Sequence, residues 1–222
     1  MTRRNTARLA GFAYLLYIAV AFPSMILLSR ATSGEGMAAK LASLARHASD
    51  VRLAAVLTLF GCFCALALAV SLRAITRDQD ADLAMLGLTC RLAEGVTGAV
   101  SIPATLALLA LATATGPNAP DPAAAQTLGA FVLDDSFVVA ASFFAVGSTL
   151  FSWLLLRGRM IPVPLAWLGV VASILIVVGL PLQLGGVLHG AVTQLMWLPM
   201  AAFEIPLGFW LLIKGVAPLE AR

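Results

Sequence analysis

The sequence predicts an all-α membrane protein, a single domain of about six transmembrane helices. The chain has 222 residues, of which 61% are hydrophobic and 11% are charged. A soluble domain is usually about 45–50% apolar and about 25% charged, and the mean hydropathy of +0.97 points the same way. A bilayer-crossing helix needs about 20 apolar residues. The chain has room for six of them, and no long polar segment remains for a separate soluble domain.

The first expected span is Leu9–Ser29, and Arg3, Arg4 and Arg8 precede it. A basic segment before an apolar one also describes a signal peptide. However, this apolar run is longer than the usual signal core, and Arg30 follows it without a convincing small-x-small cleavage site. We therefore expect an uncleaved first helix that begins in the cytoplasm.

The polar stretch after the first span contains an apolar stripe. Met37, Leu41 and Leu44 recur at i, i+4 and i+7, which is the spacing of one helical face. We expect a short amphipathic helix over residues 37–46 that lies on the outer membrane surface. A loop in which the pattern arises by chance is the alternative.

The other five expected spans are Val51–Leu72, Leu83–Thr113, Leu128–Leu156, Pro162–Leu184 and Ala191–Ile213. A charged turn, Arg73–Asp82, separates the second span from the third. The stretch Thr115–Thr127 is rich in proline and alanine and is expected to be an exposed loop. Pro162 can open the fifth span because the first turn of a helix tolerates proline.

Basic residues are distributed unevenly between the two sides that six spans imply. Nine lie on the side of the termini, namely Arg3, Arg4, Arg8, Arg73, Arg77, Arg157, Arg159, Lys214 and Arg222. Four lie on the opposite side, namely Arg30, Lys40, Arg46 and Arg52. Because cytoplasmic loops carry the excess of Lys and Arg, we expect both termini in the cytoplasm. The same bias accounts for the net charge of +3, so no nucleic-acid partner is expected.

Three charged side chains lie deep inside the apolar spans, far from their ends. Arg91 and Glu94 are three residues apart in the third span and share a helical face. At about 1.5 Å per residue they lie roughly 12 Å and 16 Å from the cytoplasmic end, and Glu204 of the sixth span lies roughly 14 Å in. An ionisable group at this depth costs about 2.5–3.5 kcal/mol on insertion scales and usually faces a partner inside the bundle.

We therefore expect Arg91 to be neutralised by Glu204, by Glu94, or by both, with Glu204 as the better partner across helices. One carboxylate then remains spare. The third span also carries a seam of small and polar residues that continues through Gly98 to Ser101 and Thr105. The candidate ligand or ion site is Arg91, Glu94, Glu204 and Ser101, with Asp134, Asp135 and Gln194 as secondary candidates.

Three prolines lie near these residues. Pro103, Pro199 and Pro206 leave the carbonyls of Ala99, Leu195 and Ala202 without helix donors. Freed carbonyls beside buried carboxylates are parts from which transporters build cation or proton sites. The alternatives are that the Arg/Glu cluster only holds helices together while the prolines bend them, or that it catalyses a reaction.

Enzyme chemistry has little support in the sequence. The two histidines, His47 and His189, are too few for the clusters of membrane metal enzymes, and Cys62, Cys64 and Cys90 fit apolar filling inside spans. No phosphate loop or dinucleotide fingerprint is present. We expect no metal, no cofactor and no catalytic residues.

Several stretches together resemble an uncharacterised family of bacterial membrane proteins, the domain-of-unknown-function family 4386. They are ARLAGFAYLL, LAMLGLTCRLAEG, LFSWLLLRGRMIPVPLAWLGVVASIL and FEIPLGFWLLIKGV. The resemblance covers nearly the whole chain, and its most specific pieces are RLxE and the terminal FE element. It implies a multi-pass fold in the bacterial cytoplasmic membrane, with Arg91, Glu94 and Glu204 as the family's polar positions, and it implies no activity.

We therefore expect a small-molecule or ion transporter or sensor with a buried Arg/Glu site. The main alternative is a membrane interaction or assembly protein in which that cluster is purely structural, and a lipid-active membrane enzyme is a third. The expected partners are the lipid bilayer and a small-molecule or lipid ligand, and an oligomer is left open. A ligand-sized cavity beside the cluster would favour the first class, whereas close packing would favour the second.

Overall fold

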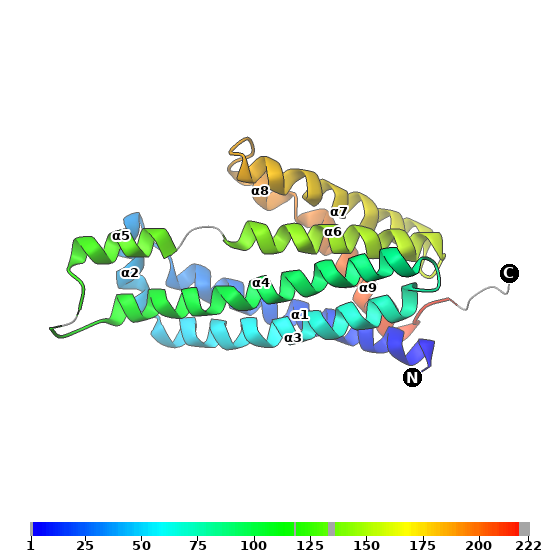
Figure 1. The fold of residues 1–222 in the computed structure, drawn as a ribbon, viewed down its shortest axis with the longest axis horizontal. Coiled ribbons are helices and arrows are strands. Elements are labelled where there is room, and N and C mark those ends of the chain that lie inside the picture. The colour runs from blue at the N-terminus through cyan, green and yellow to red at the C-terminus, as the bar shows by residue number, and fades with distance from the viewer. Residues whose placement is uncertain (1, 118, 133–135, 218–222) are drawn as a thin grey trace. The chain divides into compact units, whose positions relative to one another are not determined.

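The structure is a computed structural model that describes residues 2–117, 119–132 and 136–217, and these residues form a succession of α-helices (Figure 1). The helices are α1 (Arg3–Ala31), α2 (Gly36–Arg46), α3 (Ala48–Thr76), α4 (Ala81–Thr113), α5 (Pro122–Val132), α6 (Ser136–Arg157), α7 (Val163–Leu184), α8 (Ala191–Leu195) and α9 (Leu198–Ile213).

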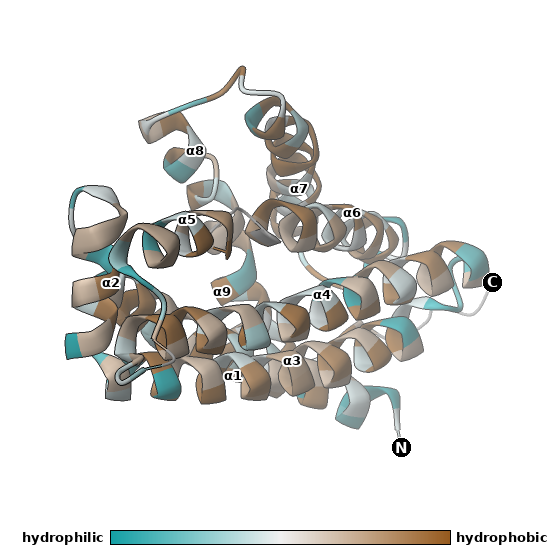
Figure 2. Cartoon of the chain, turned by 60° about the vertical axis from the view of Figure 1, so that its left-hand side comes forward, coloured by the Kyte–Doolittle hydropathy of each residue, from teal (hydrophilic) through white to brown (hydrophobic). Residues whose placement is uncertain are grey.

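Within the described residues, six stretches are long and apolar enough to cross a membrane. They are Arg3–Ala31, Ala48–Thr76, Ala81–Thr113, Pro122–Arg157, Val163–Leu184 and Ala191–Ile213. Large apolar side chains such as Phe12, Val100 and Phe209 are exposed on them, as expected for helices whose solvent is lipid. Figure 2 shows the long helices mostly in the hydrophobic colour. The predicted all-α class with six membrane-crossing helices is confirmed.

The fourth expected span differs from the structure. Helix begins at Pro122, inside the stretch Thr115–Thr127 that was expected to be a loop, and the described helical residues of this region belong to α5 and α6. The early start has a local cause, because the side-chain oxygen Oδ1 of Asp121 accepts hydrogen bonds from the backbone N–H groups of Ala123 and Ala124, at 2.9 and 3.0 Å. This is the usual capping arrangement before a first-turn proline.

The sixth expected span is interrupted rather than continuous. Helix α8 ends at Leu195 and α9 begins at Leu198, with Met196 and Trp197 between them. Pro199 explains the break, because it has no N–H to donate to the carbonyl of Leu195 but is accepted in the first turn of a new helix.

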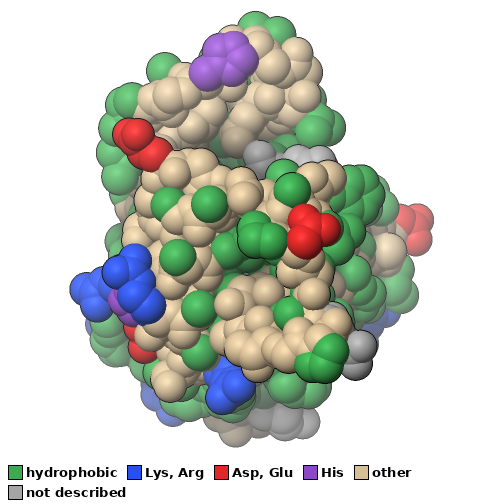
Figure 3. Space-filling view, turned by 90° about the vertical axis from the view of Figure 1, so that its left-hand side faces the viewer, with side chains coloured by type: hydrophobic (Ala, Val, Ile, Leu, Met, Phe, Trp, Pro, Cys, Tyr) green, Lys and Arg blue, Asp and Glu red, His purple; other side chains and the backbone are tan. Residues whose placement is uncertain are grey.

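The chain divides into two compact units. Unit 1 comprises Met1–Ile18, Phe63–Val96 and Phe137–Arg222, and unit 2 comprises Ala19–Cys62 and Thr97–Ser136. The long helices α1, α3 and α4 contribute residues to both. Figure 3 shows one face of the molecule, on which the described basic and acidic side chains lie in separate small groups.

Unit 2 contains the amphipathic segment expected at residues 37–46, and it is the helix α2. Its apolar face does not contact lipid alone, because Leu41 and Leu44 are buried in a cluster with residues of α1, α3 and α4. Helix α5 packs against α2, and a β-carbon built on Gly129 of α5 would lie 3.0 Å from Sδ of Met37. The apolar stripe therefore has a protein partner that the sequence pattern did not reveal.

Unit 1 gathers the basic ends of its helices. Nη2 of Arg3 donates to the carbonyl oxygen of Ile75 at 3.0 Å, and the N–H of Ala217 donates to the carbonyl oxygen of Met160 at 3.0 Å. The start of α1, the end of α3, the α6–α7 turn and the segment after α9 therefore lie together. These are segments in which basic residues are concentrated.

Candidate functional site

Three of the expected site residues, Arg91, Glu94 and Glu204, lie in unit 1 and are buried. Their exposed fractions are 1%, 7% and 8%. Arg91 and Glu94 project from α4, and Glu204 projects from α9. With Tyr14 and Tyr17 of α1 they form what we call the buried polar cluster.

Arg91 and Glu94 form an ion pair within one helix. Nη1 of Arg91 lies 2.9 Å from Oε2 of Glu94, because residues three apart on a helix are neighbours on its surface. Oε1 of the same carboxylate accepts a hydrogen bond of 3.0 Å from the hydroxyl of Tyr17. Glu94 is thus held from two sides, by its own helix and by α1.

The rest of the Arg91 side chain is enclosed by aromatic rings and a glycine. Its guanidinium carbon lies 4.8 Å from the ring centre of Phe144 and 5.9 Å from that of Tyr17, within the range of cation–π attraction. A β-carbon built on Gly147 of α6 would lie 3.0 Å from Cγ of Arg91. Gly147 therefore leaves the space through which the arginine stem passes.

Arg91 keeps hydrogen-bonding capacity that the described residues do not use. Its Nε and Nη2 atoms are buried and have no hydrogen-bond partner in the described part of the chain. A buried donor left unmet costs about 1–3 kcal/mol, and more when it is charged. The guanidinium therefore keeps donors that could serve a further acceptor.

Glu204 is held by a tyrosine and not by arginine. Its Oε1 accepts a hydrogen bond of 2.8 Å from the hydroxyl of Tyr14. Among the described residues Arg91 is ion-paired with Glu94, one of the two expected partners, and no ion pair with Glu204, the expected partner across helices, is present. The reason is geometric: Glu94 is one turn away on the same helix, whereas Glu204 would have to reach across from α9.

Glycines bring α1 and α9 close enough for the Tyr14–Glu204 contact. A β-carbon built on Gly11 would lie 2.6 Å from the carbonyl oxygen of Gly208, and one built on Gly208 would lie 2.8 Å from Cδ2 of Leu15. Real β-carbons do not approach so closely, so the two backbones meet because these positions lack side chains. Tyr14 lies one turn after Gly11 and Glu204 one turn before Gly208, which places both at this contact.

Sequence reasoning missed Tyr14 and Tyr17. A signal was available, because these are the only two tyrosines of the chain, they are three residues apart in a membrane span, and buried phenol hydroxyls need partners. The two tyrosine hydroxyls could have been predicted to donate hydrogen bonds to the two buried carboxylates.

The sequence as a whole was compared with known proteins. A family model described as a domain of unknown function, DUF4386, matches residues 9–215. The chain belongs to this family. No curated protein and no solved structure matches it. The matched region contains all five residues of the buried polar cluster.

The remaining candidates of this DUF4386 chain do not join the cluster in the described structure. Ser101 belongs to unit 2, and its hydroxyl donates to the carbonyl oxygen of Gly98 at 2.6 Å. Gln194 is exposed on α8. Asp134 and Asp135 lie outside the described residues.

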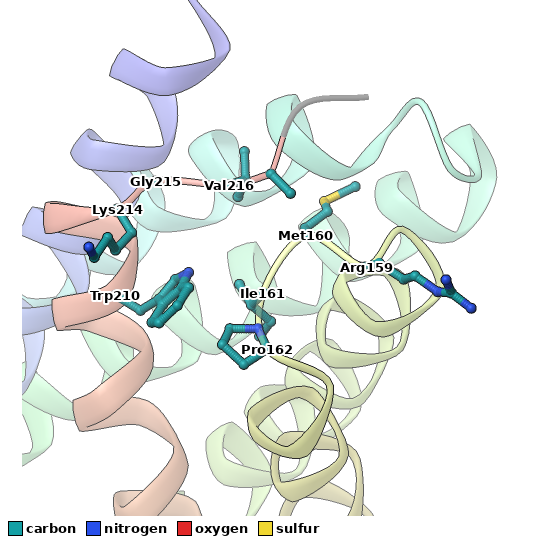
Figure 4. Close-up of a pocket in the computed structure, with 9 residues that line it drawn as sticks. Arg159, Met160, Ile161, Pro162, Trp210, Lys214, Gly215 and Val216 are labelled. Atoms are coloured by element: carbon teal, nitrogen blue, oxygen red, sulfur yellow. The ribbon is translucent and has the colours of Figure 1, made fainter. Parts of the chain in front are cut away.

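The lining of two cavities in the described DUF4386 chain includes no residue of the cluster. One, in unit 1, has a volume of about 420 Å³ and lies between the α6–α7 turn and the end of α9 (Figure 4). The other, in unit 2, has a volume of about 220 Å³ and is lined by residues of α2, α4 and α5. No group of three or more His, Cys, Asp or Glu suited to a metal occurs in the described residues.

Proposed function

We propose that this DUF4386 chain is an ion transporter or sensor of the bacterial cytoplasmic membrane that works by exchanging a proton at the buried polar cluster. The observation that carries the proposal is the charge count. One guanidinium faces two carboxylates, and Arg91 is already paired with Glu94. Glu204 accepts a hydrogen bond from the hydroxyl of Tyr14 and forms no ion pair with a described residue.

The spare carboxylate needs a positive partner because charge inside a bilayer is costly. A proton bound by either carboxylate would bring the cluster to zero net charge without any new space. The ionisable groups that bear on it are Tyr14 and Tyr17 from α1 and Arg91 and Glu94 from α4. Between residues 137 and 156 of α6, and throughout α7, there is no ionisable side chain. The other ionisable groups within the membrane part of unit 1 are the thiols Cys64 and Cys90.

The sequence predicts a site for either a small molecule or an ion. The packing around the cluster favours a proton over an organic ligand. No residue of the cluster lines the cavity of unit 1, and the Arg91 stem fills the space beside Gly147. Glu94 and Glu204 nevertheless keep 7% and 8% of their surface accessible. The unmet donors of Arg91 provide a place for a water molecule, and water is the usual carrier of a proton to a buried carboxylate. The tyrosine hydroxyls can both donate and accept.

The broken sixth span supports the same reading. Interrupted helices with freed backbone carbonyls line ion sites in many transporters. Here α8 and α9 are separate, and Pro206 lies inside α9 two residues after Glu204. Pro206 leaves the carbonyl of Ala202 without its helix donor.

The orientation belongs to the proposal as well. The basic segments that gather at one end of unit 1 are those that the positive-inside rule assigns to the cytoplasm. Both termini then lie in the cytoplasm, and the surrounding lipid is the obligate partner.

The second candidate function is a membrane interaction or assembly protein in which the cluster only holds α1, α4 and α9 together. Close packing at Gly147 and at Gly11 favours this structural role, because a cluster that only holds helices together needs no access to water. The two candidates differ in whether a carboxyl group of the cluster changes its protonation state.

Infrared difference spectroscopy of the purified protein in liposomes, recorded against pH, tests the proposal. A protonated carboxylic acid has a carbonyl band that is separate from the bands of a carboxylate. We expect a buried acid band that is lost as pH rises and that Glu204→Gln or Glu94→Gln removes. Glu35→Gln, which changes an exposed carboxyl on the approach to α2, is the matched control and should leave it unchanged. A spectrum in which neither cluster variant alters a titrating band would leave the structural candidate.

A further inference from the structure

The cavity in unit 1 is not used by the proposed proton exchange, and its lining suggests a separate ligand. It is formed by two short segments, Arg159–Pro162 after α6 and Lys214–Ala217 after α9, together with Trp210. Its volume is about 420 Å³. The hydrogen bond from Ala217 N–H to the carbonyl oxygen of Met160, at 3.0 Å, ties the two segments together.

The lining is apolar on the inside. Figure 4 shows the indole ring of Trp210 on one side of the cavity and Ile161 with Pro162 on the other. Met160 and Val216 add further apolar surface. This surface can receive the glycerol and upper acyl-chain part of a lipid, whereas a small inorganic anion would gain nothing from it.

Cations surround the cavity. Arg159 and Lys214 belong to its lining, and Figure 4 shows them on opposite sides with their charged ends directed away from each other. Arg3 lies behind it, with Nη2 3.5 Å from Sδ of Met160. Arg4 is also near, since a β-carbon built on Gly215 would lie 3.5 Å from its Cγ.

Among the described residues, no acidic side chain lines the cavity. Among the described residues the ion pairs are those of Arg77, Arg91 and Arg157, so no described carboxylate neutralises the four cations around the cavity. Asp80, in the turn between α3 and α4, is engaged by Arg157 at 3.5 Å. The local charge is therefore positive and is complementary to an anion.

The cavity also lies at the ends of membrane-crossing stretches, where lipid headgroups are expected. It adjoins the ends of α6 and α9 and the start of α7, each of which belongs to a membrane-crossing stretch. Tryptophan prefers this interface because its ring is apolar and its N–H is polar. Basic pockets between membrane helices at this level are suited to anionic headgroups.

We propose that this cavity binds an anionic phospholipid, with the glycerol region against Trp210 and the headgroup at the basic rim to which Arg159 and Lys214 belong. The cavity shares no residue with the buried polar cluster, so the lipid proposal can be tested independently of the proton exchange.

Native mass spectrometry of the full chain in mixed micelles tests the proposal with three probes: phosphatidylglycerol, phosphatidylcholine and inorganic phosphate. We expect retention of phosphatidylglycerol in preference to phosphatidylcholine, without displacement by inorganic phosphate. The double variant Arg159→Gln/Lys214→Gln should weaken phosphatidylglycerol binding roughly thirtyfold, the loss expected when two cations near an anionic lipid are removed. The matched control is Lys40→Gln/Arg46→Gln, which also removes two positive charges, but from α2, and should change binding little.

Three results would overturn the proposal: equal binding of both lipids, equal losses in the two double variants, or displacement by inorganic phosphate. A second measurement does not depend on any variant folding. A photoreactive phosphatidylglycerol added to the wild-type protein should label the peptides that contain Trp210 or Met160. Labelling spread evenly over the membrane-crossing helices would contradict a defined site.

Discussion

The pairing inside the buried polar cluster predicts that Arg91→Gln is severely destabilising. The substitution leaves the Glu94 carboxylate, 7% exposed, without the guanidinium that lies 2.9 Å away. Removing one partner of a buried ion pair costs about 3–5 kcal/mol. The loss of stacking on Phe144, at 4.8 Å, adds up to about 2 kcal/mol for a desolvated cation. We therefore expect a loss of at least about 3 kcal/mol in the free energy of unfolding.

A double-mutant cycle identifies the partner. Arg91→Gln, Glu94→Gln and the combined variant are unfolded with denaturant in mixed micelles and followed by the loss of helical circular dichroism. The combined variant should lose less than the sum of the single losses, because removing the second charge relieves the first. The same cycle with Glu204→Gln should give a smaller coupling, because Glu204 is held by Tyr14.

Arg157→Gln is the control for the loss of an arginine. Its side chain is 51% exposed and lies 3.5 Å from Asp80, and exposed pairs contribute about 0–1 kcal/mol. Additive losses in the Arg91/Glu94 cycle, or a loss for Arg91→Gln no larger than that for Arg157→Gln, would refute the pairing.

Two further predictions concern the site and the topology. Tyr14→Phe removes the hydroxyl that donates to Glu204 and should lower the free energy of unfolding by about 0.6–1.7 kcal/mol, the range of hydrogen bonds between membrane helices. No further change in a chain that also carries Glu204→Ala, which removes the acceptor, would confirm that the two side chains act as a pair, whereas an undiminished loss in that background would contradict it. Reporter fusions at Arg77 and Asn118 should report the cytoplasmic and the outer side respectively, because of the uneven distribution of basic residues; the same side for both would mean that the number of spans between them is wrong.

Hydropathy was sufficient to predict the helices, and it was insufficient to predict where they break. An apolar run marks a span because lipid excludes polar groups along its whole length. The interruption at Met196 and the early start at Pro122 depend instead on single backbone donors and caps, which a hydropathy average does not detect. The position of Pro199 does indicate the interruption. A proline inside a helix bends it, whereas a proline in the first turn begins a new helix, and the sequence analysis did not distinguish these two effects.

The cluster was predictable in part for a similar reason. Arg91, Glu94 and Glu204 stand out because charge is rare inside apolar spans. Their partners Tyr14 and Tyr17 are only weakly polar and do not stand out. The pairing also depends on the contact between Gly11 and Gly208, two residues almost two hundred positions apart in the chain. A pattern within one span does not report which other span will pack against it.

The contact between α1 and α9 has a consequence for biosynthesis. Helix α4 enters the membrane long before α9 has been translated, so Arg91 and Glu94 must be accommodated while Glu204 does not yet exist. The i, i+3 ion pair allows α4 to enter with its two charges already matched. Glu204 is synthesised after the other residues of the cluster, when the Tyr14 hydroxyl is already available as its hydrogen-bond donor. The order in which the ribosome delivers the helices thus agrees with the order in which their polar groups can be satisfied.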